Sequence, residues 1–132
     1  MPTFGNKSKE NLLTCHEKLQ LVCWEAIAIM DFTVLEGHRD QEKQALMFNE
    51  GKSKTKWPRS KHNRLPSHAV DIAPYPIDWG DRERFYMLAG IMFGIAFKHG
   101  IKLRWGGDWD GDMDFKDQSF NDLPHFELIE EY

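Results

Sequence analysis

The sequence predicts an α+β fold, with a small mixed or antiparallel sheet and flanking helices in a single domain. Three observations support this prediction. The chain has 132 residues, of which 41% are apolar and 13% aromatic, and this suits one globular core. Apolar residues recur at the three- and four-residue steps of a helix in separate stretches. Short runs rich in β-branched and aromatic residues stand between these stretches and predict strands.

The N-terminal third predicts two helices and one strand. The first helix is expected at about Ser8–Met30, with Ser8 as its N-cap. The run "FTVLEG" follows it and predicts a short strand that ends in a glycine turn. A second helix is expected over Asp40–Asn49, with Asp40 as its cap and Gly51 as its stop.

The remaining elements alternate between loops, strands and one long helix. Lys52–Arg64 is polar and basic and predicts a long loop, a feature that is often functional in compact domains. The run "AVDIAPYP" predicts a short strand that its prolines end. The strongest helix is expected over Asp81–His99, with Gly100 beyond its end. The strand "IKLRW", an acidic loop over Gly106–Asn121 and a last strand "HFELIE" complete the order.

Charge and hydropathy disfavour several classes of protein. A formal net charge of −4 gives no broad basic footprint, so nucleic acid is not expected as a partner. No run approaches the roughly 18 apolar residues of a membrane span, so no membrane insertion is expected. The N-terminus lacks the apolar core of a secretory signal peptide. We therefore expect a protein that is made and kept in the cytoplasm, at least until something releases it.

Two segments combine histidines with carboxylates at the edge of an expected strand. They are "SKHNRLPSHAVDIAPYP" at 60–76 and "NDLPHFEL" at 121–128. Zinc prefers histidine nitrogen and carboxylate oxygen, and a catalytic zinc site keeps one of four positions for water. The candidate ligands are His62, His68, Asp71, Asp122, His125 and Glu127.

Strand alternation separates the two histidines of the first segment. His68 differs in parity from Asp71, so the two side chains should point to opposite faces of the strand. His62 lies further back in the loop and can fold over onto Asp71. We therefore prefer His62 and Asp71 as ligands and expect His68 at the surface or in support of a ligand. His68 in place of His62 remains the alternative.

The second segment offers a ligand and an acid in different positions. Pro124 favours an extended residue before it, so His125 should enter the last strand with Glu127 on the same face. Asp122 comes three residues before His125, in the loop. An acid beside a metal but not bound to it is suited to act as a general base towards water.

Taken together, these segments resemble the M15 zinc peptidases. The resemblance lies in "SKHNRLPSHAVDIAPYPIDW", "LRWGGDWDGD" and "DLPHFEL", and it covers about Leu35–Leu128. More narrowly, these segments resemble the phage endolysins that act as L-alanyl-D-glutamate peptidases. Those enzymes are related to D-Ala-D-Ala carboxypeptidases and dipeptidases. The segment "EGHRDQEKQ" also resembles the arginine-bearing segment of that family.

The resemblance implies one zinc ion per chain, with three ligands: His62, Asp71 and His125. It implies that Asp122 is the catalytic base and that Ser60 contacts the substrate. Arg39 would stabilise the developing oxyanion or hold a substrate carboxylate, and its permanent charge suits either role. The alternative for Arg39 is a surface cation that caps the next helix.

Aromatic and acidic residues suggest two further sites. Trp57 and Trp79 flank the expected site in the sequence and could line a substrate groove. Alternating aspartates in the acidic loop suit the oxygen coordination of Ca²⁺, although a solvated loop is the alternative. These aspartates are Asp108, Asp110, Asp112 and Asp114.

The predicted function is zinc-dependent hydrolysis of the L-Ala–D-Glu bond in peptidoglycan stem peptides by a phage or prophage endolysin. We expect a monomer that uses residues 1–132 as one catalytic domain, without a separate cell-wall-binding domain. A D-Ala-D-Ala carboxypeptidase or dipeptidase is the close alternative. A metal-dependent nuclease is less consistent with the acidic balance of the chain. A non-catalytic, metal-stabilised binding module is the remaining alternative.

Overall fold

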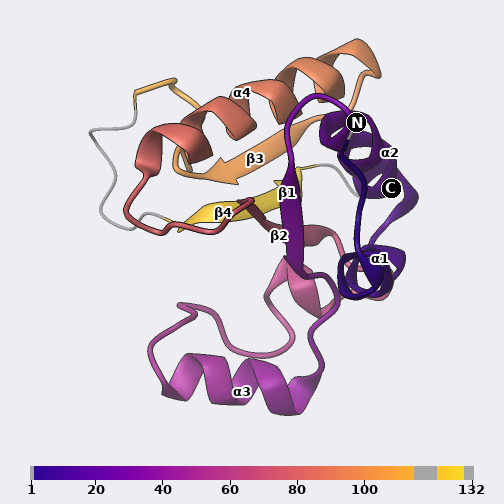
Figure 1. Ribbon diagram of the computed structural model, residues 1–132. Coiled ribbons are helices and arrows are strands. Elements are labelled where there is room, and N and C mark those ends of the chain that lie inside the picture. Colours follow the sequence, from indigo (N-terminus) through magenta and orange to yellow (C-terminus); the bar gives the residue numbers. More distant parts are fainter. Residues whose placement is uncertain (1, 115–121, 130–132) are drawn as a thin grey trace.

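A computed structural model describes residues 2–114 and 122–129 of the chain (Figure 1). Its helices are α1 (Asn6–Leu13), α2 (Glu17–Ile27), α3 (Gln41–Asn49) and α4 (Arg82–Lys98), with a 3₁₀ turn at Lys61–Asn63. Its strands are β1 (Phe32–Glu36), β2 (Ala69–Pro74), β3 (Leu103–Gly106) and β4 (Asp122–Leu128). The predicted α+β class is therefore confirmed.

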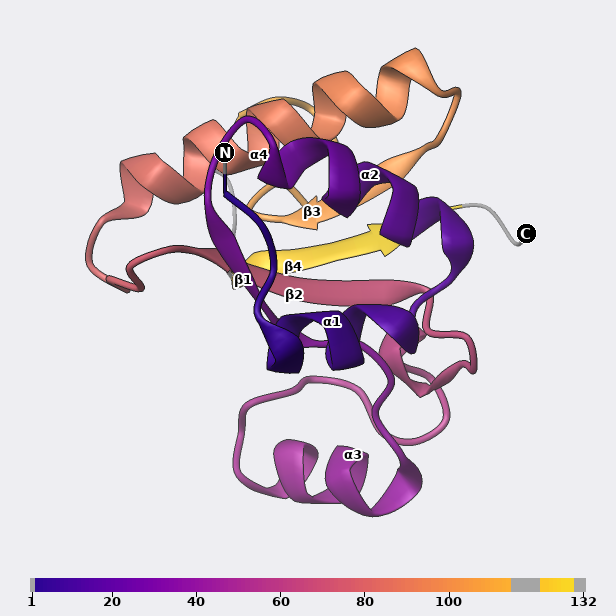
Figure 2. The ribbon, with the colours of Figure 1, turned by 45° about the vertical axis from the view of Figure 1, so that its right-hand side comes forward.

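The four strands form one antiparallel sheet in the order β1-β2-β4-β3. Alternate residues of the central strands, among them Val70, Ile72, Phe126 and Leu128, are buried in the hydrophobic core. Helix α4 packs on β2, β3 and β4, and α2 packs on α4. In both views α4 lies on one side of the sheet and α3 on the other (Figures 1 and 2).

The opposite face of the sheet carries polar side chains in register. Asp71 on β2 pairs with Glu36 on β1 and with His125 on β4. Glu127 on β4 pairs with Arg104 on β3. Residues directly opposite each other in antiparallel strands place their side chains on the same face. Register alone therefore collects acids, a histidine and an arginine on the face away from α4.

The single helix expected over Ser8–Met30 is wrong, because two helices occupy this stretch. Helix α1 ends at Leu13, and the chain then leaves the helical path to pair with the segment before β2. Cys15 forms an isolated bridge with Ser67, and the His16 amide donates to the Ser67 carbonyl at 2.8 Å. These long-range hydrogen bonds replace the intrahelical ones, and apolar periodicity carries no sign of them.

Other predicted helix boundaries have mixed outcomes. Ser8 is not an N-cap: it lies inside α1, and its hydroxyl accepts a hydrogen bond from the Val34 amide at 3.0 Å. Asp40 does cap α3, because its carboxylate accepts from the Lys43 amide at 2.8 Å. Gly51 follows α3 with φ of +75°, the left-handed conformation that favours glycine at a helix end.

The predicted long loop returns the chain from α3 to the sheet. It is largely irregular, but its end forms the 3₁₀ turn that carries His62. Ser60 caps this turn: its hydroxyl accepts from the His62 amide at 3.2 Å, and its own amide donates to the Asn63 side chain at 3.1 Å. The cap fixes the direction in which the His62 side chain leaves the loop.

Two predicted segments near the C-terminus, the acidic loop and the last strand, extend into residues that the structure does not describe. The acidic loop expected over Gly106–Asn121 is described only as far as Asp114, and residue 130 of the last expected strand also lies outside. Strand β4 begins at Asp122, three residues earlier than expected. Within the described ranges, no helix is both long and apolar enough to cross a membrane.

Candidate active site

Three predicted ligands converge on the polar face of the sheet. Nε2 of His62 lies 3.1 Å from Oδ1 of Asp71 and 3.3 Å from Nδ1 of His125. Nδ1 of His125 lies 3.2 Å from the same Asp71 oxygen. The three side chains come from the 3₁₀ turn, β2 and β4, so residues far apart in the sequence form one group that could hold a metal ion.

The size and chemistry of this group fit a tetrahedral metal ion. Ligands at about 2.0–2.1 Å from tetrahedral zinc lie about 3.3 Å from one another. The observed separations of 3.1, 3.2 and 3.3 Å match that spacing without rearrangement. Two imidazoles and one carboxylate are also a donor set that zinc and its neighbouring transition metals accept.

Both histidines are oriented through their second ring nitrogen. Nδ1 of His62 donates to the Gly37 carbonyl at 2.7 Å, and Nε2 of His125 donates to Oε1 of Glu127 at 2.8 Å. These hydrogen bonds point the other nitrogen of each ring towards Asp71, so that the nitrogen offers its lone pair to a metal once it is deprotonated. Only glycine fits at position 37, because a Cβ there would lie 2.3 Å from Oγ1 of Thr14.

The electrostatics of the group favour a cation. Burial alone would raise the pKa of Asp71, but the charge of His62 and hydrogen bonds from His125 and His62 hold that pKa well below its usual range. Burial would lower the pKa of His125, but hydrogen bonds to Asp71 and Glu127 raise it to about 10. Metal binding must therefore displace a proton that the carboxylates stabilise on His125.

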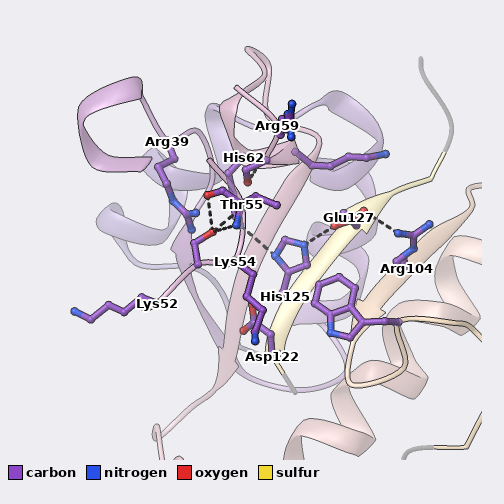
Figure 3. A pocket seen from close by; sticks show the side chains of 14 residues that line it. Arg39, Lys52, Lys54, Thr55, Arg59, His62, Arg104, Asp122, His125 and Glu127 are labelled. Carbon is purple, nitrogen blue, oxygen red and sulfur yellow. Dashed lines mark hydrogen bonds and ion pairs between the residues drawn. The ribbon is translucent and has the colours of Figure 1, made fainter. Parts of the chain in front are cut away.

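Asp122 lies beside this group as the first residue of β4, not in a loop as expected. It lines the same pocket as His62 and His125 (Figure 3). Burial and the nearby Asp71 charge raise its pKa, against the opposing charges of His125 and His62. A raised pKa strengthens a carboxylate as a proton acceptor near neutral pH. Gly106 makes room for it, since a Cβ there would lie 2.0 Å from the Asp122 carbonyl oxygen.

Arg39 is buried at the edge of the site, so the alternative of a surface cation is wrong. Its Nε and Nη2 donate to Oε1 of Glu36 at 2.9 and 2.5 Å, and its Nη1 donates to Oε1 of Gln44 at 2.9 Å. Nη2 also lies 3.8 Å from Oδ2 of Asp71. The sequence indicated Arg39 but not Glu36 or Gln44, although both stand in the same segment "EGHRDQEKQ", because only the fold brings their side chains onto the guanidinium.

An open pocket of about 430 Å³ surrounds the group. One wall consists of loop residues that include Lys52, Lys54 and Arg59, and Arg104 lies across the pocket from Lys52 (Figure 3). Trp109 also lines the pocket. The Trp109 ring lies 5.3 Å from the His125 ring. Trp109 was not among the candidate site residues that the sequence indicated. Ser60 also lines the pocket, and its contact with substrate stays a prediction.

Three residues singled out in the sequence lie elsewhere. Trp57 lines a neighbouring cavity, and Trp79 is exposed and stacks on Phe85 at 5.7 Å, so neither lines this pocket. Of the two positions expected for His68, at the surface or in support of a ligand, the surface one is wrong, because His68 is buried and its ring contacts that of His16. Within the described residues, His68 does not belong to the His62 metal group.

The acidic loop forms a second group of potential ligands. Carboxylate oxygens of Asp108, Asp110 and Asp112 lie within 4.8 Å of one another. Asp114 does not belong to this group as far as the loop is described, although its amide donates to Oδ1 of Asp112 at 2.8 Å. Calcium binding by this loop stays a prediction.

The fold and the site together define a class of protein, a small α+β domain with a His–Asp–His group that could hold a metal ion beside an open pocket. Within this class, the chain belongs to the phage L-alanyl-D-glutamate peptidase family, whose model matches residues 2–129. It is 34% identical to the L-alanyl-D-glutamate peptidase of Escherichia phage T5, over 96% of this chain and 97% of that protein.

A solved structure agrees with this family. The crystal structure of the Serratia marcescens L-Ala D-Glu endopeptidase ChiX matches with a TM-score of 0.76 and 32% sequence identity. The match covers 95% of this chain and 88% of that one. The resemblance drawn from the two histidine-bearing segments is therefore confirmed at the level of the family.

Proposed function

We propose that the chain is a zinc-dependent peptidase that hydrolyses the L-Ala–D-Glu amide bond of peptidoglycan stem peptides as a phage endolysin. The observation that carries the proposal is the convergence of His62, Asp71 and His125 within 3.3 Å of one another, beside Asp122. The names of the family and of its two relatives support the choice of bond. On this proposal, the enzyme reaches the cell wall after release from the cytoplasm.

The proposed mechanism assigns proton transfer to Asp122. Zinc held by the three ligands would supply Lewis-acid polarisation of the scissile carbonyl and of the attacking water. The Asp122 carboxylate accepts a proton from this water as the oxygen adds to the alanyl carbon. It then gives the proton to the glutamyl nitrogen as the C–N bond breaks. The products are an alanyl carboxylate and a free amine on D-Glu.

Arg39 is assigned to the oxyanion. Three of its five N–H groups are held by Glu36 and Gln44, which leaves two for a ligand. Arg39 lies beside Asp71, at the edge of the proposed metal group. This position supports stabilisation of the oxyanion over binding of a substrate carboxylate further out in the pocket. Donors held in advance by buried partners stabilise developing charge without reorganisation during the reaction.

Digestion of purified peptidoglycan tests the proposal. Mass spectrometry should find new N-terminal γ-linked D-Glu, and a zinc chelator should abolish its appearance. Loss of only a terminal D-Ala would move the protein to the carboxypeptidases. If the zinc-loaded protein cleaves nothing, the alternative of a non-catalytic, metal-stabilised binding module would be favoured.

Replacing Glu127 with glutamine is expected to weaken zinc binding about tenfold, because a neutral amide orients His125 without raising its basicity. Competition with a chromophoric chelator measures the zinc dissociation constant. Glu25→Gln is the matched control, since Glu25 contacts Lys98 at a distance from the pocket. Equal zinc affinities for Glu127→Gln and wild type would show that Glu127 does not support the metal site.

A further inference from the structure

Positive charge is concentrated in one segment of an otherwise acidic protein. Residues 52–64 contain six of the 17 Lys and Arg residues and no Asp or Glu. Because the whole chain has a formal charge of −4 and this segment has +6, the rest carries −10. The position of this segment in the fold should therefore explain why positive charge is concentrated there.

The segment lies over the candidate active site. Lys52, Lys54 and Arg59 line the pocket from the loop and are exposed, and we call these three residues the cationic wall (Figure 3). On the other side, Arg104 already faces Glu127, with Nη1 3.8 Å from Oε2. Within the cationic wall, Nζ of Lys52 lies 3.2 Å from Oε1 of Glu50, which does not line the pocket. Lys54 and Arg59 add further positive charge on this side of the pocket.

The cationic wall is anchored to the site by Gln44, which is fully buried in α3. Its Nε2 donates to the Thr55 carbonyl at 2.7 Å and to Oγ of Ser53 at 3.0 Å, on either side of the central lysine of the wall. Its Oε1 accepts from Arg39 at 2.9 Å and from Asn63 at 3.1 Å. All four hydrogen-bonding positions of the amide are occupied, so the backbone of the wall is held at a set position relative to Arg39.

The floor of the pocket carries the opposite charge. Asp122 and Glu127 line the pocket, and the Asp71 carboxylate contacts His62 and His125, which also line it. The proposed zinc ion would offset part of this negative charge, so a substrate carboxylate gains a further cationic partner only from side chains that face it. D-Glu linked through its side-chain carboxyl has such a group, because its α-carboxylate lies one carbon from the amide nitrogen.

Resting on the proposed function, we infer that the cationic wall binds a substrate carboxylate on the D-Glu side of the scissile bond. The wall thereby selects stem peptides with a free carboxylate there over peptides in which it is amidated. Ionic hydrogen bonds from lysine and arginine recognise a carboxylate but gain little from a neutral carboxamide. On this inference, Arg39 stabilises the oxyanion, and the cationic wall binds the substrate carboxylate.

The test compares zinc-loaded wild type with the double variant Lys54→Gln/Arg59→Gln on synthetic peptides. One peptide contains L-Ala–γ-D-Glu–L-Lys, and the second has the α-carboxamide in place of the α-carboxylate. The double variant should lose about tenfold in kcat/KM on the acid, mainly through KM, and less than about twofold on the amide. Raising the salt concentration should raise KM for the acid alone.

A matched control comes from the same segment. The ammonium of Lys56 lies 5.1 Å from the centre of the Phe48 ring, and Lys56 lines the neighbouring cavity. Lys56→Gln removes the same charge and should leave both peptides unaffected. A third peptide, with diaminopimelate in place of lysine, identifies the source of the carboxylate. Loss confined to this peptide would overturn the inference, because the carboxylate that the wall binds would then belong to the third residue.

Equal loss on the acid and the amide, or no loss on either peptide, would overturn the inference. Wild-type enzyme that cuts none of the peptides would contradict the proposed function and with it the inference. Wild-type cleavage with no dependence on the cationic wall would contradict the inference alone.

Discussion

Replacing Asp122 with alanine is expected to lower kcat about a thousandfold while zinc stays bound. General bases contribute about 10² to 10⁴ in rate, and the raised pKa of Asp122 suits it to accept a proton near neutral pH. The side chain lines the pocket but does not belong to the described metal group. Single-turnover cleavage of a stem peptide and metal analysis of the same sample provide the measurement.

The variant Asp122→Asn controls for loss of volume at this position. It keeps the shape of the side chain at the start of β4 but removes the proton acceptor, so it should be as inactive as Asp122→Ala. Substantial activity in either variant would contradict the assignment of the base. Loss of zinc from both would show instead that Asp122 is a ligand.

Replacing His62 with glutamine is expected to abolish activity and to weaken zinc binding by more than about a hundredfold. A loss of about a hundredfold in metal affinity is the upper limit for mutation of residues that only hydrogen-bond to a metal ligand. His62 is proposed as a metal ligand itself, so its loss should cost more. Its Nε2 faces both Asp71 and His125, at 3.1 and 3.3 Å. Glutamine cannot supply the imidazole nitrogen in this geometry. Zinc titration against a competing chelator measures the loss.

His68→Gln is the matched variant, because the sequence left His68 open as the alternative ligand. His68 is buried and contacts the His16 ring, and within the described residues it does not belong to the metal group. We expect zinc binding to survive this substitution. Retention of zinc by His62→Gln together with its loss from His68→Gln would reverse the assignment.

The local part of the site could be predicted because it depends on strand alternation. Parity separated Asp71 from His68, and it placed His125 and Glu127 on one face, where the structure finds them hydrogen-bonded at 2.8 Å. The register could not be predicted. Asp71 meets His125 because β4 inserts between β2 and β3, and no local pattern encodes that order.

The remaining errors come from long-range hydrogen bonds. The first predicted helix is interrupted because His16 bonds to Ser67, more than fifty residues away. Arg39 is buried beside Gln44, a polar residue of α3 whose own burial no local pattern predicts. The basic loop could be predicted as functional from its length and composition. Its attachment to the site through Gln44 depends on tertiary structure alone.

Anomalous diffraction from crystals of the zinc-loaded protein tests the central claim most directly, because it locates the metal without reference to activity. We predict one anomalous peak at the zinc edge, about 2.0–2.2 Å from His62 Nε2, His125 Nδ1 and an Asp71 oxygen, with the fourth position open to the pocket. A zinc peak elsewhere, or a fourth protein ligand that closes the site, would contradict the account of a catalytic centre.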